Sequence, residues 1–174
     1  MNIQIAPALE IVIPAYRMHT QTFNNALHGI SEADAWKRIE NRTNHILWMT
    51  GNLVNTRYWL ADVLGIGEKD PNEDLFKDAK SLDEKLKYPS LESLKIEWHK
   101  ISRIVFQKII GMSPSELKQP YSFGMNVSFV EENKLNMAGM CIDRESYLFG
   151  QIGLMRRILG YPGMSYEMNN DLGY

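Results

Sequence analysis

Apolar residues recur every three or four positions along most of this chain, which is the spacing of a helix that buries one face. The pattern predicts four long helices, at about residues 15–30, 44–64, 90–109 and 131–159. Ser90 is the predicted N-cap of the third helix, and Gly65 and Gly160 follow the second and the fourth. Residues 68–89 are polar and interrupted by prolines, which predicts a surface loop.

Shorter signals lie between the long helices. Residues 31–34 (Ser-Glu-Ala-Asp) look like a capping box, and residues 113–116 (Ser-Pro-Ser-Glu) predict a short helix that Pro120 stops. Residues 121–130 are predicted to be extended or irregular. Because no repeat, low-complexity tract or linker interrupts the chain, we predict one domain over residues 1–174, an all-α four-helix bundle.

The composition is that of an ordinary globular domain, with 174 residues of which 44% are apolar and 23% charged. A formal net charge of −2 without any basic block argues against nucleic-acid binding. No apolar run reaches the roughly 18 residues of a membrane span, and residues 1–15 lack the basic start of a signal peptide. The single cysteine, Cys141, excludes an internal disulfide and a Cys-rich zinc site, so we expect a cytoplasmic protein.

Two segments carry a resemblance to a known family. Residues 44–54 (Asn-His-Ile-Leu-Trp-Met-Thr-Gly-Asn-Leu-Val) precede Arg-Tyr-Trp-Leu at 57–60, and residues 144–151 (Arg-Glu-Ser-Tyr-Leu-Phe-Gly-Gln) precede Arg-Arg-Ile-Leu-Gly at 156–160. These segments are similar to the second and fourth helices of the DinB/YfiT-like superfamily. The resemblance implies a four-helix bundle with long crossover connections, from a family of metal-dependent enzymes that often form homodimers.

The resemblance also implies where a metal site would lie. Members of that family hold a divalent metal with one histidine on the second helix and two histidines four residues apart on the last. Residues four apart share a helix face, so both imidazoles reach one ion. At the matching positions this chain has Asn52, Arg144 and Leu148. Leucine has no ligand atom and arginine stays cationic, so we expect the metal site to be absent and no cofactor to be bound.

The histidines of the chain offer no replacement set. No two of them are three or four residues apart, and only His45 lies on the same predicted helix as Asn52, two turns before it. A lone helix histidine is usually solvated or hydrogen-bonded. The four histidines are His19, His28, His45 and His99.

The positions that replace the metal ligands form the candidate ligand pocket. Arg144 falls on a stripe of the last helix that is predicted to face the interior: Met137, Cys141, Arg144, Leu148, Gln151, Met155 and Ile158. An inward arginine either pairs with a buried carboxylate, extends to the rim, or holds an anionic group of a ligand. Asn52 either borders a polar cleft or is a satisfied amide, and Cys141 is predicted to be a small buried hydrophobe.

Three hypotheses of function follow. The first is a metal-free DinB-like protein that binds a small molecule or pairs with a partner, with Asn52, Arg144 and Leu148 in the pocket. Trp48, Tyr147 and Gln151 are the further candidate lining residues. The second is a metal-dependent hydrolase or small-thiol S-transferase with a non-standard ligand set. The third is a stress-related interaction scaffold. A homodimer is expected from the resemblance, whereas Ser or Cys hydrolase motifs are missing.

Overall fold

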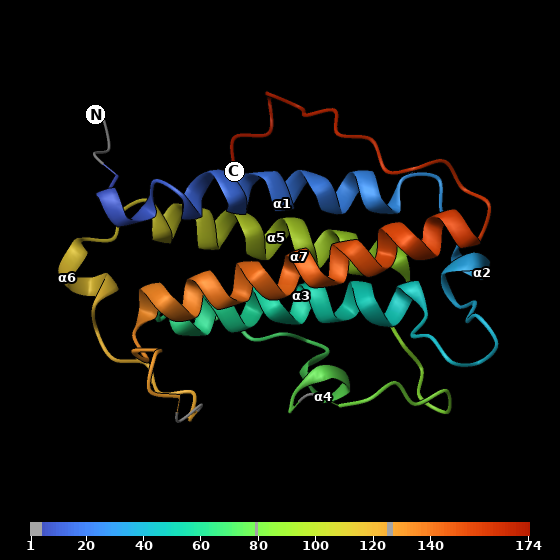
Figure 1. Ribbon diagram of the computed structural model, residues 1–174, viewed down its shortest axis with the longest axis horizontal. Helices are drawn as coiled ribbons and strands as arrows, with labels where there is room; N and C mark the ends of the chain where they lie inside the picture. The colour runs from blue at the N-terminus through green and yellow to red at the C-terminus, as the bar shows by residue number, and fades with distance from the viewer. Residues whose placement is uncertain (1–4, 79, 125–126) are drawn as a thin grey trace.

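The computed structural model describes residues 5–78, 80–124 and 127–174 and forms an all-α bundle within them, which confirms the predicted fold class. Figure 1 shows the long helices side by side, with short helices in the connections. The long helices are α1 (Val12–Leu27), α3 (Ile46–Val63), α5 (Leu91–Ile109) and α7 (Lys134–Ile158). The short elements are η1 (Pro7–Leu9), α2 (Glu32–Ala35), α4 (Glu73–Phe76) and α6 (Pro114–Leu117).

Side chains at the helix starts explain most of the boundaries. The Ser90 and Ser113 side chains accept hydrogen bonds from the backbone of Ser93 and Glu116, as the sequence predicts, and Ser113 completes a full capping box. The cap of α3 is unexpected, because the Nδ1 atom of His45 accepts the Trp48 N–H at 2.9 Å. A neutral imidazole nitrogen therefore replaces the usual hydroxyl or amide oxygen.

The core lies between the four long helices, where α3 packs against both α5 and α7, and α1 packs against α7. Phe23 of α1 stacks on Trp98 of α5 with ring centroids 4.4 Å apart, and both side chains are fully buried. At the end of the bundle, Arg156 donates to the Ala26 and His28 carbonyls at 2.8 and 2.7 Å. Arg156 thus satisfies free carbonyls at the C-terminus of α1.

The inward face of α7 differs from the predicted stripe. Met137, Cys141, Leu148 and Met155 are buried as predicted, but Arg144 and Ile158 are exposed and Gln151 is half-buried. Glu145, which is 0% exposed, takes the inward place that the stripe gave to Arg144. The inward face is centred about one residue further along the helix, and the Glu145 carboxylate can be buried there because it has a buried cationic partner on α3.

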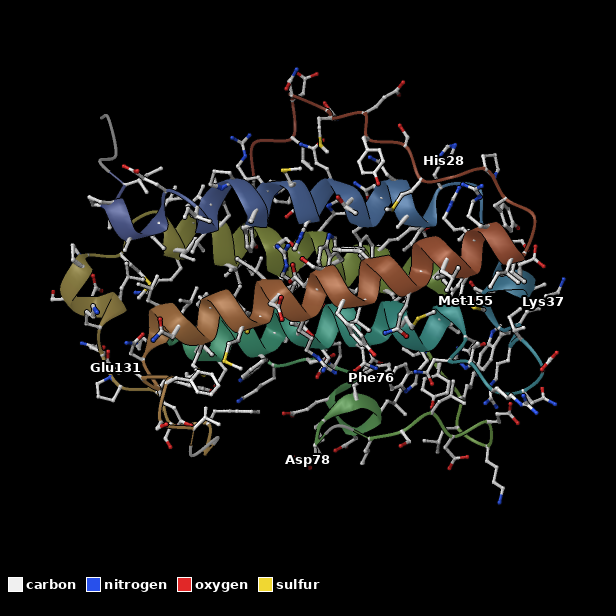
Figure 2. All side chains as sticks on the ribbon, in the orientation of Figure 1. His28, Lys37, Phe76, Asp78, Glu131 and Met155 are labelled. Atoms are coloured by element: carbon white, nitrogen blue, oxygen red, sulfur yellow. The ribbon has the colours of Figure 1, made fainter. Side chains whose placement is uncertain are left out.

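The connection between α3 and α5 lies across the outer side of α3 and carries α4 (Figures 1 and 2). Phe76 of α4 points toward α3 and lies directly on Gly51. A Cβ atom on Gly51 would be 2.0 Å from the Phe76 ring, so only glycine permits this contact. The contact fixes the segment that forms one wall of the candidate site.

The last segment, residues 160–174, returns along α1 (Figure 1). Its backbone accepts a hydrogen bond from Asn25 at 2.9 Å and from Arg17 at 3.4 Å. In the described part of the chain, no helix is long and apolar enough to cross a membrane.

Candidate ligand site

The most polar part of the interior is a buried centre where all four long helices meet. Arg57 of α3 binds Glu145 of α7 through two hydrogen bonds, Nε to Oε1 at 2.5 Å and Nη2 to Oε2 at 2.9 Å. Its other N–H groups reach the Thr20 and Ser102 hydroxyls and the Tyr16 carbonyl, at 3.1, 3.3 and 3.2 Å. The guanidinium therefore has an acceptor for each of its five donors.

Aromatic rings enclose the same guanidinium. The Arg57 Cζ atom lies 3.8 Å from the Tyr16 ring centroid and 4.2 Å from that of Trp98. Burial raises the pKa of Tyr16 to about 12, and its hydroxyl donates to the Ser102 carbonyl at 2.6 Å. These groups satisfy one another, so we interpret the buried centre as a structural tie between the helices.

Cys141 lies one turn before Glu145 and is fully buried, as predicted. Burial raises the pKa of the Cys141 thiol well above its ordinary value. A thiol held neutral in this way is a poor nucleophile.

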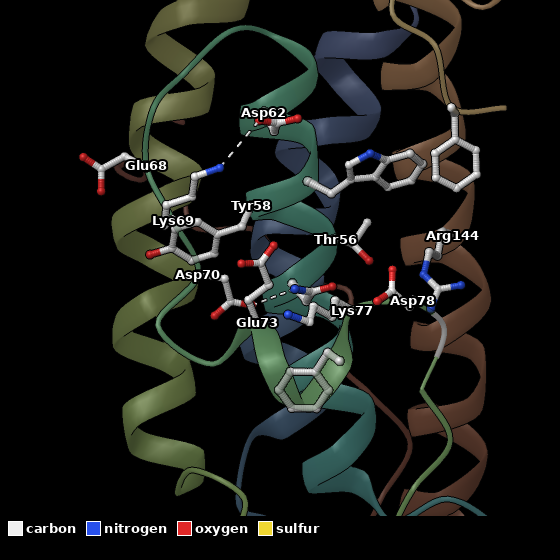
Figure 3. Close-up of a pocket in the computed structure, with 14 residues that line it drawn as sticks. Thr56, Tyr58, Asp62, Glu68, Lys69, Asp70, Glu73, Lys77, Asp78 and Arg144 are labelled. Atoms are coloured by element: carbon white, nitrogen blue, oxygen red, sulfur yellow. Dashed lines mark hydrogen bonds and ion pairs between the residues drawn. The ribbon is translucent and has the colours of Figure 1, made fainter.

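A pocket of about 470 Å³ opens on the outer side of α3, beneath the α4 segment and beside α7 (Figure 3). Its wall combines aromatic rings with charges of both signs. The lining residues are Asn55, Thr56, Tyr58, Trp59, Asp62, Glu68, Lys69, Asp70, Glu73, Phe76, Lys77, Asp78, Phe123 and Arg144. This volume falls within the range of small-molecule sites.

Arg144 connects the pocket to the positions identified from the sequence. It is exposed rather than turned into the core, and its Nη2 atom donates to Asn52 Oδ1 at 3.1 Å across the α3–α7 interface. The Asn52 Nδ2 atom in turn donates to the Trp48 carbonyl at 3.2 Å. Among the described residues, no carboxylate forms an ion pair with Arg144.

The other predicted positions lie away from this pocket. Leu148 is 3% exposed and packs in the core, and Asn52 is 2% exposed beneath Arg144. Trp48 and Gln151 are half-buried and are not among the lining residues, and Tyr147 is 68% exposed on the outer side of α7. Arg144 is thus the predicted site residue that reaches the pocket wall directly.

The α4 segment supplies a part of the pocket that the sequence pattern did not predict. Asp70 is 8% exposed and accepts hydrogen bonds from Asn55 Nδ2 and from the Asn72 backbone N–H, each at 2.8 Å. Trp59 of α3 and Phe123 lie with ring centroids 4.9 Å apart. Asn55 could have been identified from the sequence, because it lies one turn after Asn52 on the same helix. The loop residues carry no helical pattern from which their positions could be predicted.

The histidines do not gather at the pocket. His19 lies 3.0 Å from Glu145, His45 caps α3, and His99 contacts Tyr174 and Asn24. Burial lowers the pKa of His45 to about 4, so the cap is a neutral imidazole at pH 7. Within the described ranges, no three His, Cys, Asp or Glu side chains form a group that could hold a metal ion.

No protein-family model matches this chain, and no curated protein matches it either. The bundle and the pocket beside Arg144 are therefore the features that bear on its function.

Proposed function

We propose that this protein is a DinB-like bundle without the three-histidine metal site of that family, and that it binds a small organic anion in the pocket beside α3. The observation that carries the proposal is Arg144 at the pocket wall, oriented by Asn52 at 3.1 Å. These are two of the three positions at which the resemblance would put metal ligands, and their contact across α3 and α7 supports that alignment.

The chemistry of the wall suits an anion with an apolar body. A guanidinium binds carboxylate or phosphate through two parallel N–H groups, and Asn52 occupies only one Nη atom of Arg144. The Trp59 and Phe123 rings provide a flat apolar surface in the same pocket. Asp78 also lines the pocket, and its negative charge opposes an anion near Arg144.

Calorimetric titration with a panel of aromatic and aliphatic carboxylates and phosphates tests the proposal. We expect binding by the wild type and at least roughly tenfold weaker binding by Arg144→Gln, because a charge-assisted hydrogen bond contributes about 1.5–3 kcal/mol. Asp78→Asn should strengthen binding, and asparagine accepts the positive φ of 58° at this position. Arg42→Gln, at an 84% exposed side chain, is the matched control. Equal affinities for Arg144→Gln and the wild type would refute the anion site.

The alternative is a metal-dependent hydrolase or small-thiol S-transferase that uses a non-standard ligand set. Elemental analysis of the purified protein separates the two, because stoichiometric Zn, Ni, Mn or Fe would contradict the metal-free proposal. The converse experiment restores histidines with the triple variant Asn52→His, Arg144→His, Leu148→His. Metal uptake by this variant and not by the parent would support the alignment, whereas a folded variant without metal would show that the alignment is wrong.

We also propose that the protein forms a homodimer through the outer face of α7. Asp143, Tyr147, Gly150, Leu154 and Arg157 recur at steps of three and four on this face and are all exposed. The stripe is self-complementary in an antiparallel pair that crosses at Gly150. Asp143 of each copy then faces Arg157 of the partner subunit, and Gly150 lets the helices approach closely.

Light scattering coupled to size-exclusion chromatography checks the dimer. Tyr147 and Leu154 are 68% and 61% exposed, so Leu154→Glu should yield monomers without disturbing the core. Asp143→Arg should weaken the dimer by juxtaposing like charges, and adding Arg157→Asp should restore it. A monomeric wild type at micromolar concentration would overturn this proposal and would leave the anion site unaffected.

A further inference from the structure

The pocket has a second charged end, opposite in sign to Arg144. Asp70 accepts its hydrogen bonds from Asn55 and the Asn72 backbone, and in the described part of the chain no cationic side chain forms an ion pair with it. Burial raises the pKa of Asp70, and the nearby Glu73 and Glu97 carboxylates also raise it. A cation that enters here would therefore stabilise the ionised carboxylate.

The two charged ends are fixed to the same helix. Asn52 holds Arg144 and Asn55 holds Asp70, and these two asparagines are three residues apart on α3. Residues three apart lie on one helix face with a rise of about 4.5 Å between them. Figure 3 shows Asp70 on the α4 side of the pocket and Arg144 on the α7 side, with Thr56 drawn between them. The two charged ends are thus each held by an asparagine of the same helix.

The other cations of the pocket are already engaged. Lys77 forms an ion pair with Asp74 at 2.5 Å, and Lys69 lies 3.9 Å from Asp62. Glu73 is a second acid at the Asp70 end of the pocket. Tyr58, which also lines the pocket, donates a hydrogen bond to the Glu97 carboxylate at 2.5 Å. The Asp70 end of the pocket is consequently negative and partly desolvated, whereas the α7 end holds the Arg144 guanidinium together with the Asp78 carboxylate.

We propose that the pocket selects molecules that carry a primary ammonium group together with an acid group, with the ammonium at Asp70 and the acid at Arg144. This inference rests on the proposed anion site and adds the second recognition element. The Trp59 and Phe123 rings favour a ligand with an apolar or aromatic side chain, as in a short peptide or an aromatic amino acid.

Three matched probes separate the contributions of the two charges. Glycyl-phenylalanine carries both, N-acetyl-glycyl-phenylalanine lacks the ammonium, and glycyl-phenylalanine amide lacks the carboxylate. We expect calorimetric titration to show each blocked probe binding roughly tenfold or more weakly than the dipeptide. Free phenylalanine, whose charges are closer together, should bind more weakly than the dipeptide, because Asp70 and Arg144 lie on opposite sides of the pocket.

The two variants assign each charge to its partner. Asp70→Asn should bind the dipeptide and its N-acetyl derivative equally, and Arg144→Gln should bind the dipeptide and its amide equally. Asparagine has the shape of aspartate, but its single side-chain oxygen can accept only one of the two hydrogen bonds, from Asn55 or from the Asn72 N–H, so thermal unfolding verifies that the fold is intact. Glu10→Gln, at an exposed carboxylate outside the pocket, serves as the control and should keep the wild-type preferences.

The outcomes distinguish this inference from the anion site on which it rests. If the N-acetyl probe binds the wild type as tightly as the dipeptide while the amide does not, the ammonium site is wrong and the anion site stands. If the amide binds as tightly as the dipeptide, the anion site at Arg144 is wrong. If none of the three probes binds, the proposed ligand class is overturned.

Discussion

Two arginines on facing helices, Arg57 and Arg144, stand in opposite environments. Arg57 is fully buried in the centre of the bundle, and each of its N–H groups has a protein acceptor. Arg144 is exposed at a pocket, where its guanidinium donates a hydrogen bond to Asn52. When every N–H group of a guanidinium donates to the protein, the side chain stabilises the fold. When only one N–H group donates to the protein, the remaining donors can bind a ligand.

Two acidic side chains, one at the buried centre and one at the pocket, extend the comparison. Glu145 is buried with a cation at hydrogen-bond distance, and Asp70 is nearly as buried with amide and backbone partners instead. Burial raises the pKa of Asp70. The bundle therefore compensates its central charge internally, whereas Asp70 has no cationic partner among the described residues.

The largest expected effect comes from breaking the central pair. Glu145→Gln leaves the Arg57 guanidinium buried with a neutral partner, so we expect a loss of about 3–5 kcal/mol in the free energy of unfolding. Urea denaturation measures the loss. The matched control is Glu84→Gln, which removes the surface partner of Arg38 at a 61% exposed carboxylate and should cost less than about 1 kcal/mol. Similar losses in the two variants would show that the buried centre is not a structural tie.

A smaller loss is expected where the α4 segment packs on α3. Gly51→Ala places a methyl group 2.0 Å from the Phe76 ring and should destabilise the protein by about 1–3 kcal/mol through displacement of α4. The same change at Gly139, where a Cβ meets no atom within 4 Å, should stabilise α7 by about 0.5–1 kcal/mol. Urea denaturation compares the two, and limited proteolysis of residues 68–89 reports the displacement. Protection of that loop in Gly51→Ala would contradict this account.

The pH dependence of stability reports on Asp70, and its effect should be smaller than that of Gly51→Ala. The folded-state pKa of Asp70 is raised above its ordinary 3.8, so its contribution to stability is present below that pH and lost as pH rises through the raised value. The amide that Asp70→Asn introduces does not titrate, so this variant should gain stability relative to the wild type between acid and neutral pH. Urea denaturation of both proteins across that range tests it, and parallel curves would show that Asp70 is not desolvated.

The smallest effect is expected at Arg144. Arg144→Gln removes one hydrogen bond at an exposed side chain, so the free energy of unfolding should change by less than about 0.5 kcal/mol. Arg57→Gln is the comparison and should cost several times more, because it leaves Glu145 buried without its cation. A large loss in Arg144→Gln would mean that Arg144 supports the fold, and the assignment of its free donors to a ligand would fail.

The sequence predicted the long helices and the N-caps of α5 and α6 because those signals are local. Apolar spacing within one helix locates α5, and Ser90 and Ser113 act on residues three positions away. The prediction was wrong by about one residue in the inward face of α7, where it favoured Arg144 over Glu145. The partner that allows Glu145 to be buried is 88 residues away, and no local pattern reveals it.

The sequence by itself determined that this chain is a helical bundle, and it identified Asn52 and Arg144 as positions of interest. Only the tertiary structure decided that these two residues touch, that Arg57 and Glu145 form the buried centre, and that Asp70 joins the pocket. The physical reason is the range of the interactions. Helix formation and capping act within a few residues, whereas the pocket is closed by a loop whose place depends on one ring packing on one glycine, Phe76 on Gly51.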